Sequence, residues 1–167
     1  MRKRLTAIGT AILLCAVVSQ SQAQGAGKPL VRETLRNDVG IELLGKALLY
    51  SFSYQRAVGR SLGLEAGFGA LGGGGSSTSS AILFFPVSAK LYLIPKDGTL
   101  YLTGGAVLVT ASTSSGPLDN ATNFYGDVGL GFEFRSSGGF LFRGTAYALF
   151  ASGGYFIWPG ITVGYAF

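Results

Sequence analysis

The charged residues that could act in catalysis or in ion pairs lie at alternate positions of extended segments. Asp127 and Glu133 share one parity, which would place them on one face of a β-strand. Lys90, Arg135 and Arg143 fall on the corresponding face of their own segments. Such residues can act as general acid and base, or they can pair as ions where unpaired charge would be costly.

The sequence lacks the residue types that most hydrolytic sites need. Its 167 residues include no histidine and a single cysteine, Cys15. A Ser-His-acid triad, a His-activated water and a zinc site built from His or Cys are therefore excluded. A catalytic carboxylate pair needs a substrate pocket as well, so we expect no enzymatic activity, no cofactor and no metal.

One glycine-rich motif, at residues 67–72, matches the dinucleotide fingerprint G-x-G-x-x-G. That fingerprint requires a helix to open at its last glycine. Here Gly73-Gly74-Gly75-Ser76-Ser77 follows, which is typical of a loop. We therefore expect the glycines to permit tight strand curvature and to leave room for neighbouring side chains.

The first 23 residues have the pattern of a secretory signal peptide. Residues 1–4 form a basic n-region, residues 5–18 are apolar, and Ser21-Gln22-Ala23 supplies small residues for cleavage after Ala23. A membrane anchor would need a longer apolar stretch. Cleavage also removes Cys15, so the mature chain has no thiol.

The composition excludes several classes of protein. The chain is 48% hydrophobic and only 13% charged, against about 25% charged in an ordinary soluble domain. Beyond the N-terminus no apolar run reaches the ~20 residues of a spanning helix. Removal of residues 2–4 leaves 10 of the 13 basic residues, against 8 acidic residues. The formal charge then falls from +5 to +2, which gives no reason to expect a nucleic-acid partner.

From about residue 38 onward, the apolar residues recur with period two, as in β-strands. The segment after Asn123 is the clearest: Phe124, Val128, Leu130, Phe132 and Phe134 lie on one face, and Tyr125, Asp127, Gly129, Gly131, Glu133 and Arg135 lie on the other. The second face has too few charges for a water-exposed exterior, so the apolar face is predicted to contact lipid. A soluble barrel that binds an apolar ligand remains the alternative.

Six segments are interpreted as strands, at about residues 61–72, 80–94, 99–112, 122–135, 139–151 and 157–167. Tight turns are predicted at Ala57 to Ser61, Pro95 to Gly98 and Ser136 to Gly139, and longer loops at Gly72 to Ser80, Ser112 to Thr122 and Ser152 to Trp158. Alternating short and long connections are typical of membrane barrels.

Upstream, the phase of the alternation changes at residues 44–47. Apolar positions are odd over 39–43 and even over 48–54. A turn there would give eight strands, whereas a bulge within one strand would give seven. We favour eight, because single-chain bacterial barrels have even strand numbers and residues 37–167 can supply eight spanning strands.

The chain ends in Ile161-Thr162-Val163-Gly164-Tyr165-Ala166-Phe167, with an aromatic final residue and apolar residues two and four before it. Together with the signal peptide and the alternating segments, this ending resembles the small outer-membrane β-barrels of Gram-negative bacteria, of the OmpA transmembrane-domain and OmpX type. The resemblance implies that Val163, Tyr165 and Phe167 form the signal read by the barrel-assembly machinery, with periplasmic chaperones as further partners during biogenesis. It carries over no activity.

Within such a barrel the polar parity faces the lumen. The predicted lumen charge network joins Glu42, Glu65, Asp127 and Glu133 to Lys90, Arg135 and Arg143. An aromatic girdle is predicted from Tyr50, Tyr54, Trp158, Tyr165 and Phe167, with packing inside the barrel as the alternative for Trp158.

The prediction is thus an all-β, membrane-spanning, antiparallel up-and-down β-barrel of about eight strands in the outer membrane. Residues 1–23 are the signal peptide, 24–37 a periplasmic N-terminal segment and 38–167 the barrel. We expect a non-enzymatic protein in contact with outer-membrane lipids, with a structural or surface-interaction role and a lumen plugged by polar side chains. A small channel for polar solutes and a soluble periplasmic barrel that binds an apolar ligand remain alternatives. The loop sequences do not indicate a particular surface partner.

Overall fold

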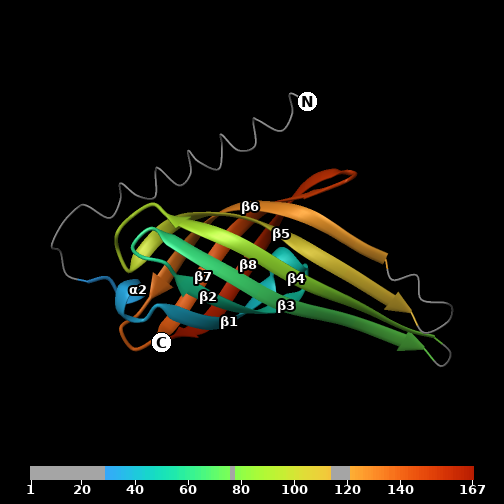
Figure 1. Ribbon diagram of the computed structural model, residues 1–167, viewed down its shortest axis with the longest axis horizontal. Helices are drawn as coiled ribbons and strands as arrows, with labels where there is room; N and C mark the ends of the chain where they lie inside the picture. Colours follow the sequence, from blue (N-terminus) through green and yellow to red (C-terminus); the bar gives the residue numbers. More distant parts are fainter. Residues whose placement is uncertain (1–28, 76–77, 114–120) are drawn as a thin grey trace, which may run out of the picture.

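The computed structural model describes residues 29–75, 78–113 and 121–167, so the predicted signal peptide lies outside the described residues. Eight strands close into one antiparallel barrel in sequence order, with β8 paired to β1 (Figure 1). The elements are α2 (Val31–Thr34), β1 (Asn37–Leu44), η1 (Gly45–Ala47), β2 (Tyr50–Ala57), β3 (Leu62–Gly75), β4 (Thr78–Tyr92), β5 (Gly98–Thr113), β6 (Ala121–Arg135), β7 (Phe140–Ala151) and β8 (Gly154–Ala166). The phase change at residues 44–47 is a turn that contains η1, which confirms eight strands.

The N-terminal start of the barrel and the C-terminus lie at one end, called here the proximal end (Figure 1). Asn37 and Phe167 exchange two backbone hydrogen bonds there, with N–O distances of 3.0 and 2.8 Å. The connections at 58–61, 93–97 and 136–139 also lie at this end, so the predicted tight turns are confirmed. The opposite end is called the distal end.

The predicted distal loops are wrong in extent, because the strands continue into them. β3 and β4 remain paired as far as Gly75 and Thr78, inside the predicted loop Gly72 to Ser80. The glycine motif at 67–72 therefore lies within a strand. Gly, Ser and Thr show no apolar alternation, but their backbone N–H and C=O groups still pair across the hairpin.

The other two distal connections are corrected in the same way. β8 begins at Gly154, so the predicted loop Ser152 to Trp158 is reduced to a turn at Ser152 and Gly153. β5 reaches Thr113 and β6 begins at Ala121, inside the predicted loop Ser112 to Thr122, of which residues 114–120 lie outside the described residues.

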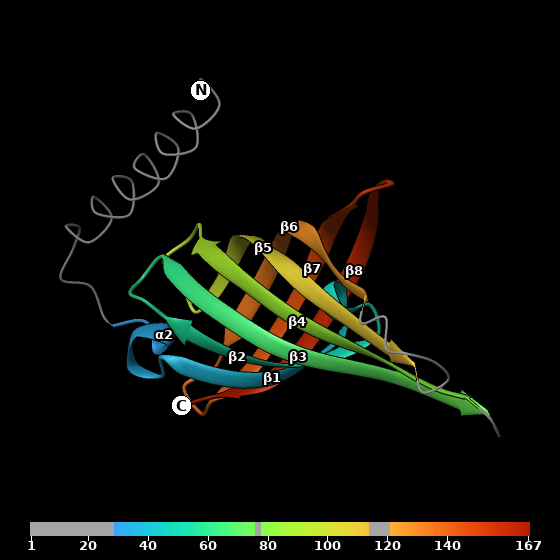
Figure 2. The same cartoon turned by 45° about the vertical axis from the view of Figure 1, so that its right-hand side comes forward.

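The distal strands do not stay together as one wall. Pairing between β6 and β7 stops at Gly126 and Phe150, whereas β7 and β8 remain paired to Ala151 and Gly154. The β3–β4 and β7–β8 hairpins consequently diverge beyond the closed barrel (Figure 2).

Side chains alternate across the barrel wall in the predicted sense. On β6, Phe132 is 43% exposed on the outside, while its neighbour Glu133 is fully buried inside. The same holds on β5, where the sequence pattern was weak: Leu100 and Leu102 point outward and Tyr101 is buried. No helix in the described part of the chain is long and apolar enough to cross a membrane.

Candidate functional site

The lumen collects most of the charged side chains of the described barrel. All of the predicted network residues, Glu42, Glu65, Lys90, Asp127, Glu133, Arg135 and Arg143, are buried there. Asp38, Lys46 and Arg32 join them, so the buried charges comprise five acidic and five basic side chains. Equal numbers matter because each buried charge needs an opposite charge or hydrogen bonds to offset its lost hydration.

Arg143 on β7 is the centre of the proximal part of the network. Its Nε donates to Glu133 Oε2 at 2.7 Å, and its Nη2 donates to Asp38 Oδ2 at 2.8 Å. Its Nη1 lies 3.7 Å from Glu65 Oε2. One guanidinium thus ties together carboxylates from β1, β3 and β6, and this arrangement spans the lumen.

Arg135 on β6 extends these contacts toward the proximal end. Its Nη2 donates to Asp38 Oδ2 at 2.5 Å, and its Nε lies 3.4 Å from Glu133 Oε1. Its Nη1 donates to the Leu35 carbonyl at 2.7 Å. Hydrogen bonds of this kind, from a guanidinium to a carboxylate, are charge-assisted and directional.

Glu65 on β3 links the proximal and distal parts of the lumen. Its two carboxylate oxygens accept hydrogen bonds from the ammonium groups of Lys46 and Lys90. Lys90 also donates to Gln55 Oε1 at 2.8 Å, and Lys46 also contacts Ser88 Oγ at 3.1 Å.

Tyrosine hydroxyls add hydrogen bonds to two of the buried carboxylates. Tyr92 donates to Glu133 Oε2 at 2.9 Å, and Tyr147 donates to Glu42 Oε1 at 2.7 Å. Glu42 therefore does not pair with a predicted cation, contrary to the expectation. Asp127 does not either: neither of its carboxylate oxygens has a hydrogen-bond partner among the described protein atoms.

Sequence reasoning missed Asp38, Lys46 and the tyrosines. Asp38 shares the even parity of Glu42 on β1, and this signal could have found it. Lys46 had no such signal, because it lies in a turn, where strand parity no longer predicts which way a side chain points.

The β1–β2 connection folds into the distal part of the lumen. Gly45, Lys46 and Ala47 are all buried, and Leu44 and Leu48 on either side take positive φ values of 59° and 71°. A left-handed backbone at a leucine is unfavourable, so tertiary contacts must hold this turn in place.

Those contacts come from distant strands. The Tyr125 hydroxyl donates to the Lys46 carbonyl, and Trp158 Nε1 donates to the Leu48 carbonyl at 3.2 Å. Ala47 packs with Phe84 and Val107 in a small apolar core. Trp158 therefore faces inward, which agrees with the alternative of packing inside the barrel and not with a girdle position.

The proximal mouth is covered by α2 and the residues beside it. The Arg32 guanidinium is buried 4.4 Å above the centre of the Tyr92 ring. Its Nη2 donates to the carbonyls of Ile94 and Lys96 at 3.2 and 2.5 Å. The Val31 amide donates to Asp97 Oδ1 at 2.8 Å, so residues 31–32 are fastened to the β4–β5 turn.

A salt bridge also joins α2 to the connection between β2 and β3. Arg60 Nε lies 2.9 Å from Glu33 Oε1. Burial tends to raise the pKa of Glu33, but hydrogen bonds from Arg60 and the Leu30 amide outweigh it and hold this pKa below its usual value. Burial lowers the pKa of Arg32, against the opposing effect of Tyr92 and Glu133.

Two residues of the predicted assembly signal, Val163 and Tyr165, lie on the outside of β8, and Phe167 directly follows the strand. Val163, Tyr165 and Phe167 are each about half exposed. Tyr50 and Tyr54 also point outward from β2. These positions place aromatic rings near strand ends on the outer surface, where rings occupy the headgroup level of a bilayer.

The carboxylate pair considered from the sequence, Asp127 and Glu133, is too widely separated to act together on one bond. Asp127 and Glu133 lie six residues apart on one strand, which corresponds to about 20 Å. Carboxylate pairs in glycosidases lie about 5 to 9.5 Å apart. Among the described residues, no cluster of three or more Cys, Asp or Glu side chains could hold a metal ion.

Comparison with solved structures identifies similar folds. The N-terminal β-barrel domain of Pseudomonas aeruginosa OprF superposes with a TM-score of 0.57 at 14% identity, over 79% of this chain and 96% of that one. Ail, the attachment invasion locus protein of Yersinia pestis, crystallised with the heparin analogue sucrose octasulfate, superposes with a TM-score of 0.53 at 16% identity, over 79% and 94%.

No protein-family model matches the sequence, and no curated protein matches it. At such low identity the structural likeness concerns the fold alone. The closed antiparallel order of eight strands, the outward apolar face and these two similar structures together show that the chain has the fold of a small outer-membrane β-barrel.

Proposed function

We propose that this protein is a non-enzymatic outer-membrane barrel with a closed lumen, which acts through the hairpins at its distal end. The proximal end, with both termini of the barrel, would face the periplasm. The observation that supports this proposal is the lumen network, in which Arg143 contacts Asp38, Glu65 and Glu133 from three strands, with the buried turn η1 on its distal side and the buried Arg32 of α2 on its proximal side.

The outer surface supports a position in a membrane. Large apolar side chains are exposed on every strand, among them Ile41, Phe52, Leu64, Val87, Leu102, Leu130, Phe142 and Ile161. A water-soluble protein rarely exposes so continuous an apolar surface. A bilayer solvates it, because the closed part of the described barrel offers an apolar band on all sides and leaves no strand edge unpaired there.

The strand lengths support a surface role. A membrane-crossing strand needs about 9 to 11 residues. β4 and β6 have 15 residues each and β5 has 16, so their distal ends extend beyond the bilayer. Projecting hairpins on a rigid barrel are the usual place for recognition.

The chemistry of the distal surface differs from that of a polyanion-binding protein. Residues 68–87, 104–126 and 144–161 contain no lysine or arginine. The Ail barrel was crystallised with a sulfated sugar. Sulfate groups need cations, so we propose instead a neutral partner that contacts the Gly, Ser and Thr of the hairpins and exposed rings such as Tyr155 and Phe124.

Planar-bilayer recording tests the closed lumen. We expect no stable conductance from the folded protein, and large, persistent channels would refute the closed lumen. In the alternative of a small channel, η1 would leave the lumen. The path would then be lined by the hydroxyls of Ser51, Ser53 and Thr103, which form no hydrogen bond within the described part of the chain.

Cell fractionation tests the location. We expect the mature protein, cleaved after Ala23, in the carbonate-resistant outer-membrane fraction with a heat-modifiable gel shift. Carbonate-soluble protein without such a shift would contradict the membrane assignment and favour a soluble barrel that binds an apolar ligand.

We further propose that Val163, Tyr165 and Phe167 act as the recognition signal for the barrel-assembly machinery. Val163 and Tyr165 lie on the outer face of β8, the strand that closes the barrel against β1, and Phe167 directly follows it. Deletion of Phe167 should lower the amount of folded protein in the outer membrane and leave the secreted precursor level unchanged. Equal assembly of the shortened chain would contradict this role.

A further inference from the structure

The outer surface of the barrel carries a groove of about 880 Å³ that crosses β8, β1, β2 and β3. Strand register explains its shape. One wall is the row Tyr165, Val39, Tyr54 and Ala66; the other is the row Val163, Ile41, Phe52 and Phe68; the floor between them is the row Gly164, Gly40, Ser53 and Gly67.

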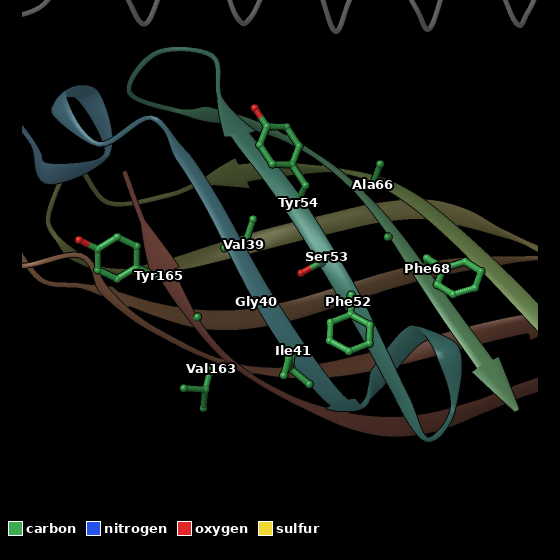
Figure 3. A pocket seen from close by; sticks show the side chains of 12 residues that line it. Val39, Gly40, Ile41, Phe52, Ser53, Tyr54, Ala66, Phe68, Val163 and Tyr165 are labelled. Atoms are coloured by element: carbon green, nitrogen blue, oxygen red, sulfur yellow. The ribbon is translucent and has the colours of Figure 1, made fainter.

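The floor is backbone, because its residues belong to the inward-facing parity and so present their main chain to the outside. Figure 3 shows Val39, Tyr54 and Ala66 on one side and Ile41, Phe52 and Phe68 on the other, with Gly40 and Ser53 between them. The lining is almost entirely apolar. A flexible hydrocarbon chain fits such a groove better than a polar group does.

Polar and basic groups lie next to the proximal wall of this groove. Arg56 follows Tyr54 on the outer face of β2 and pairs in register with Asn37. Asn37 Oδ1 accepts hydrogen bonds from the Tyr54 hydroxyl at 2.8 Å and from Arg56 Nη1 at 3.4 Å. Among the described residues Arg56 forms no ion pair, so its exposed guanidinium is available to an anion.

The exposed cations share this end of the barrel. Arg36, Arg56 and Lys96 are all exposed at the proximal end. The distal segments 68–87 and 144–161 have no charged residue. Basic residues beside a membrane attract the phosphates of its lipids, so the charge favours the periplasmic leaflet, which consists of phospholipid.

We propose that the groove holds one acyl chain of a phospholipid from the periplasmic leaflet and that Arg56 binds its phosphate. The inference rests on the proposed function, because it needs the barrel to span the outer membrane with its proximal end inward. A second copy of the chain fits less well, since a symmetric contact would bring two Arg56 guanidinium groups together with no carboxylate between them.

Native mass spectrometry of the detergent-solubilised barrel, titrated with phosphatidylglycerol, tests the proposal. We expect one tightly bound lipid per wild-type barrel. Arg56→Gln should weaken binding about fivefold, the effect of one basic residue near a lipid surface. Ala66→Trp should weaken it through steric filling of the groove.

Matched variants separate this site from general lipid contact. Lys96→Gln removes another exposed proximal cation, and Ala146→Trp adds the same ring to the outer face of β7. Both should bind the lipid like the wild type. Equal binding by Arg56→Gln, or equal loss in the control variants, would overturn the proposal. A heat-modifiable gel shift, measured on every variant, reports separately whether the barrel itself has folded.

Discussion

The two faces of the barrel wall are built from alternate residues of the same strands, yet they are stabilised differently. Inside, Glu133 and Arg143 are fully buried, and each makes directional bonds to named partners. Outside, Leu130 is 53% exposed and needs only an apolar surrounding. The inner face thus depends on specific partners, whereas the outer face depends on hydrophobicity alone. Substitutions should reveal this difference.

The largest effect is expected inside, from Arg143→Met. This change leaves the carboxylates of Asp38 and Glu133 buried with fewer cations, so it should lower the free energy of unfolding by about 3 to 5 kcal/mol. Urea titration of the barrel folded in lipid vesicles measures this. The double variant Arg143→Met with Glu133→Gln should recover part of the loss. A loss below about 1 kcal/mol in the single variant would mean that the inner face tolerates unpaired charge.

On the outer face, Leu130→Arg should have the next largest effect. A charge facing hydrocarbon near the bilayer centre costs about 2 to 4 kcal/mol. The matched change Leu130→Ile keeps an apolar surface and should stay within about 0.5 kcal/mol of wild type. The same urea titration compares them. If Leu130→Arg were as stable as Leu130→Ile, this face would not contact lipid.

Lys46→Met tests the point where the inner network reaches the inserted turn. Glu65 keeps Lys90 as a partner, so the expected loss is smaller, about 1 to 3 kcal/mol. Because η1 would be held less firmly, we also expect brief conductance events in planar bilayers. Ser88→Ala, which removes only the second partner of Lys46, serves as the control. Stability and conductance unchanged from wild type would show that η1 is held without this ion pair.

The smallest effect is expected at Glu33 in the proximal cover. Its pKa is lowered in the folded protein, so its salt bridge with Arg60 contributes above the unfolded-state pKa and is lost as the pH falls through the folded value. A partly exposed pair contributes less than about 1 kcal/mol. The hydrogen-exchange protection factors of residues 30–36, which compare each rate with the intrinsic rate at the same pH, should therefore fall below about pH 4.5 in the wild type and less so in Glu33→Gln. An identical pH response in both proteins would exclude Glu33 as the cause.

Much of the fold was predictable because strand alternation is a local property. The parity of β6 predicted which of its residues face lipid and which face the lumen, and the phase change at residues 44–47 predicted the eighth strand. The distal loops were overestimated, because Gly72 to Ser80 carries no apolar pattern although its backbone continues the ladder.

The barrel class, the direction of each face and the identity of most lumen charges follow from local alternation, since period two assigns each strand residue a side of the wall. Which of these charges meet depends on how the strands are arranged in three dimensions. Barrel closure and strand stagger bring Asp38 into contact with Arg143 and Glu42 into contact with Tyr147. They leave the Asp127 carboxylate without a hydrogen bond from any described residue. The inward turn at Lys46 and the Arg32 cover were likewise decided by contacts between residues far apart in sequence, which no local pattern encodes.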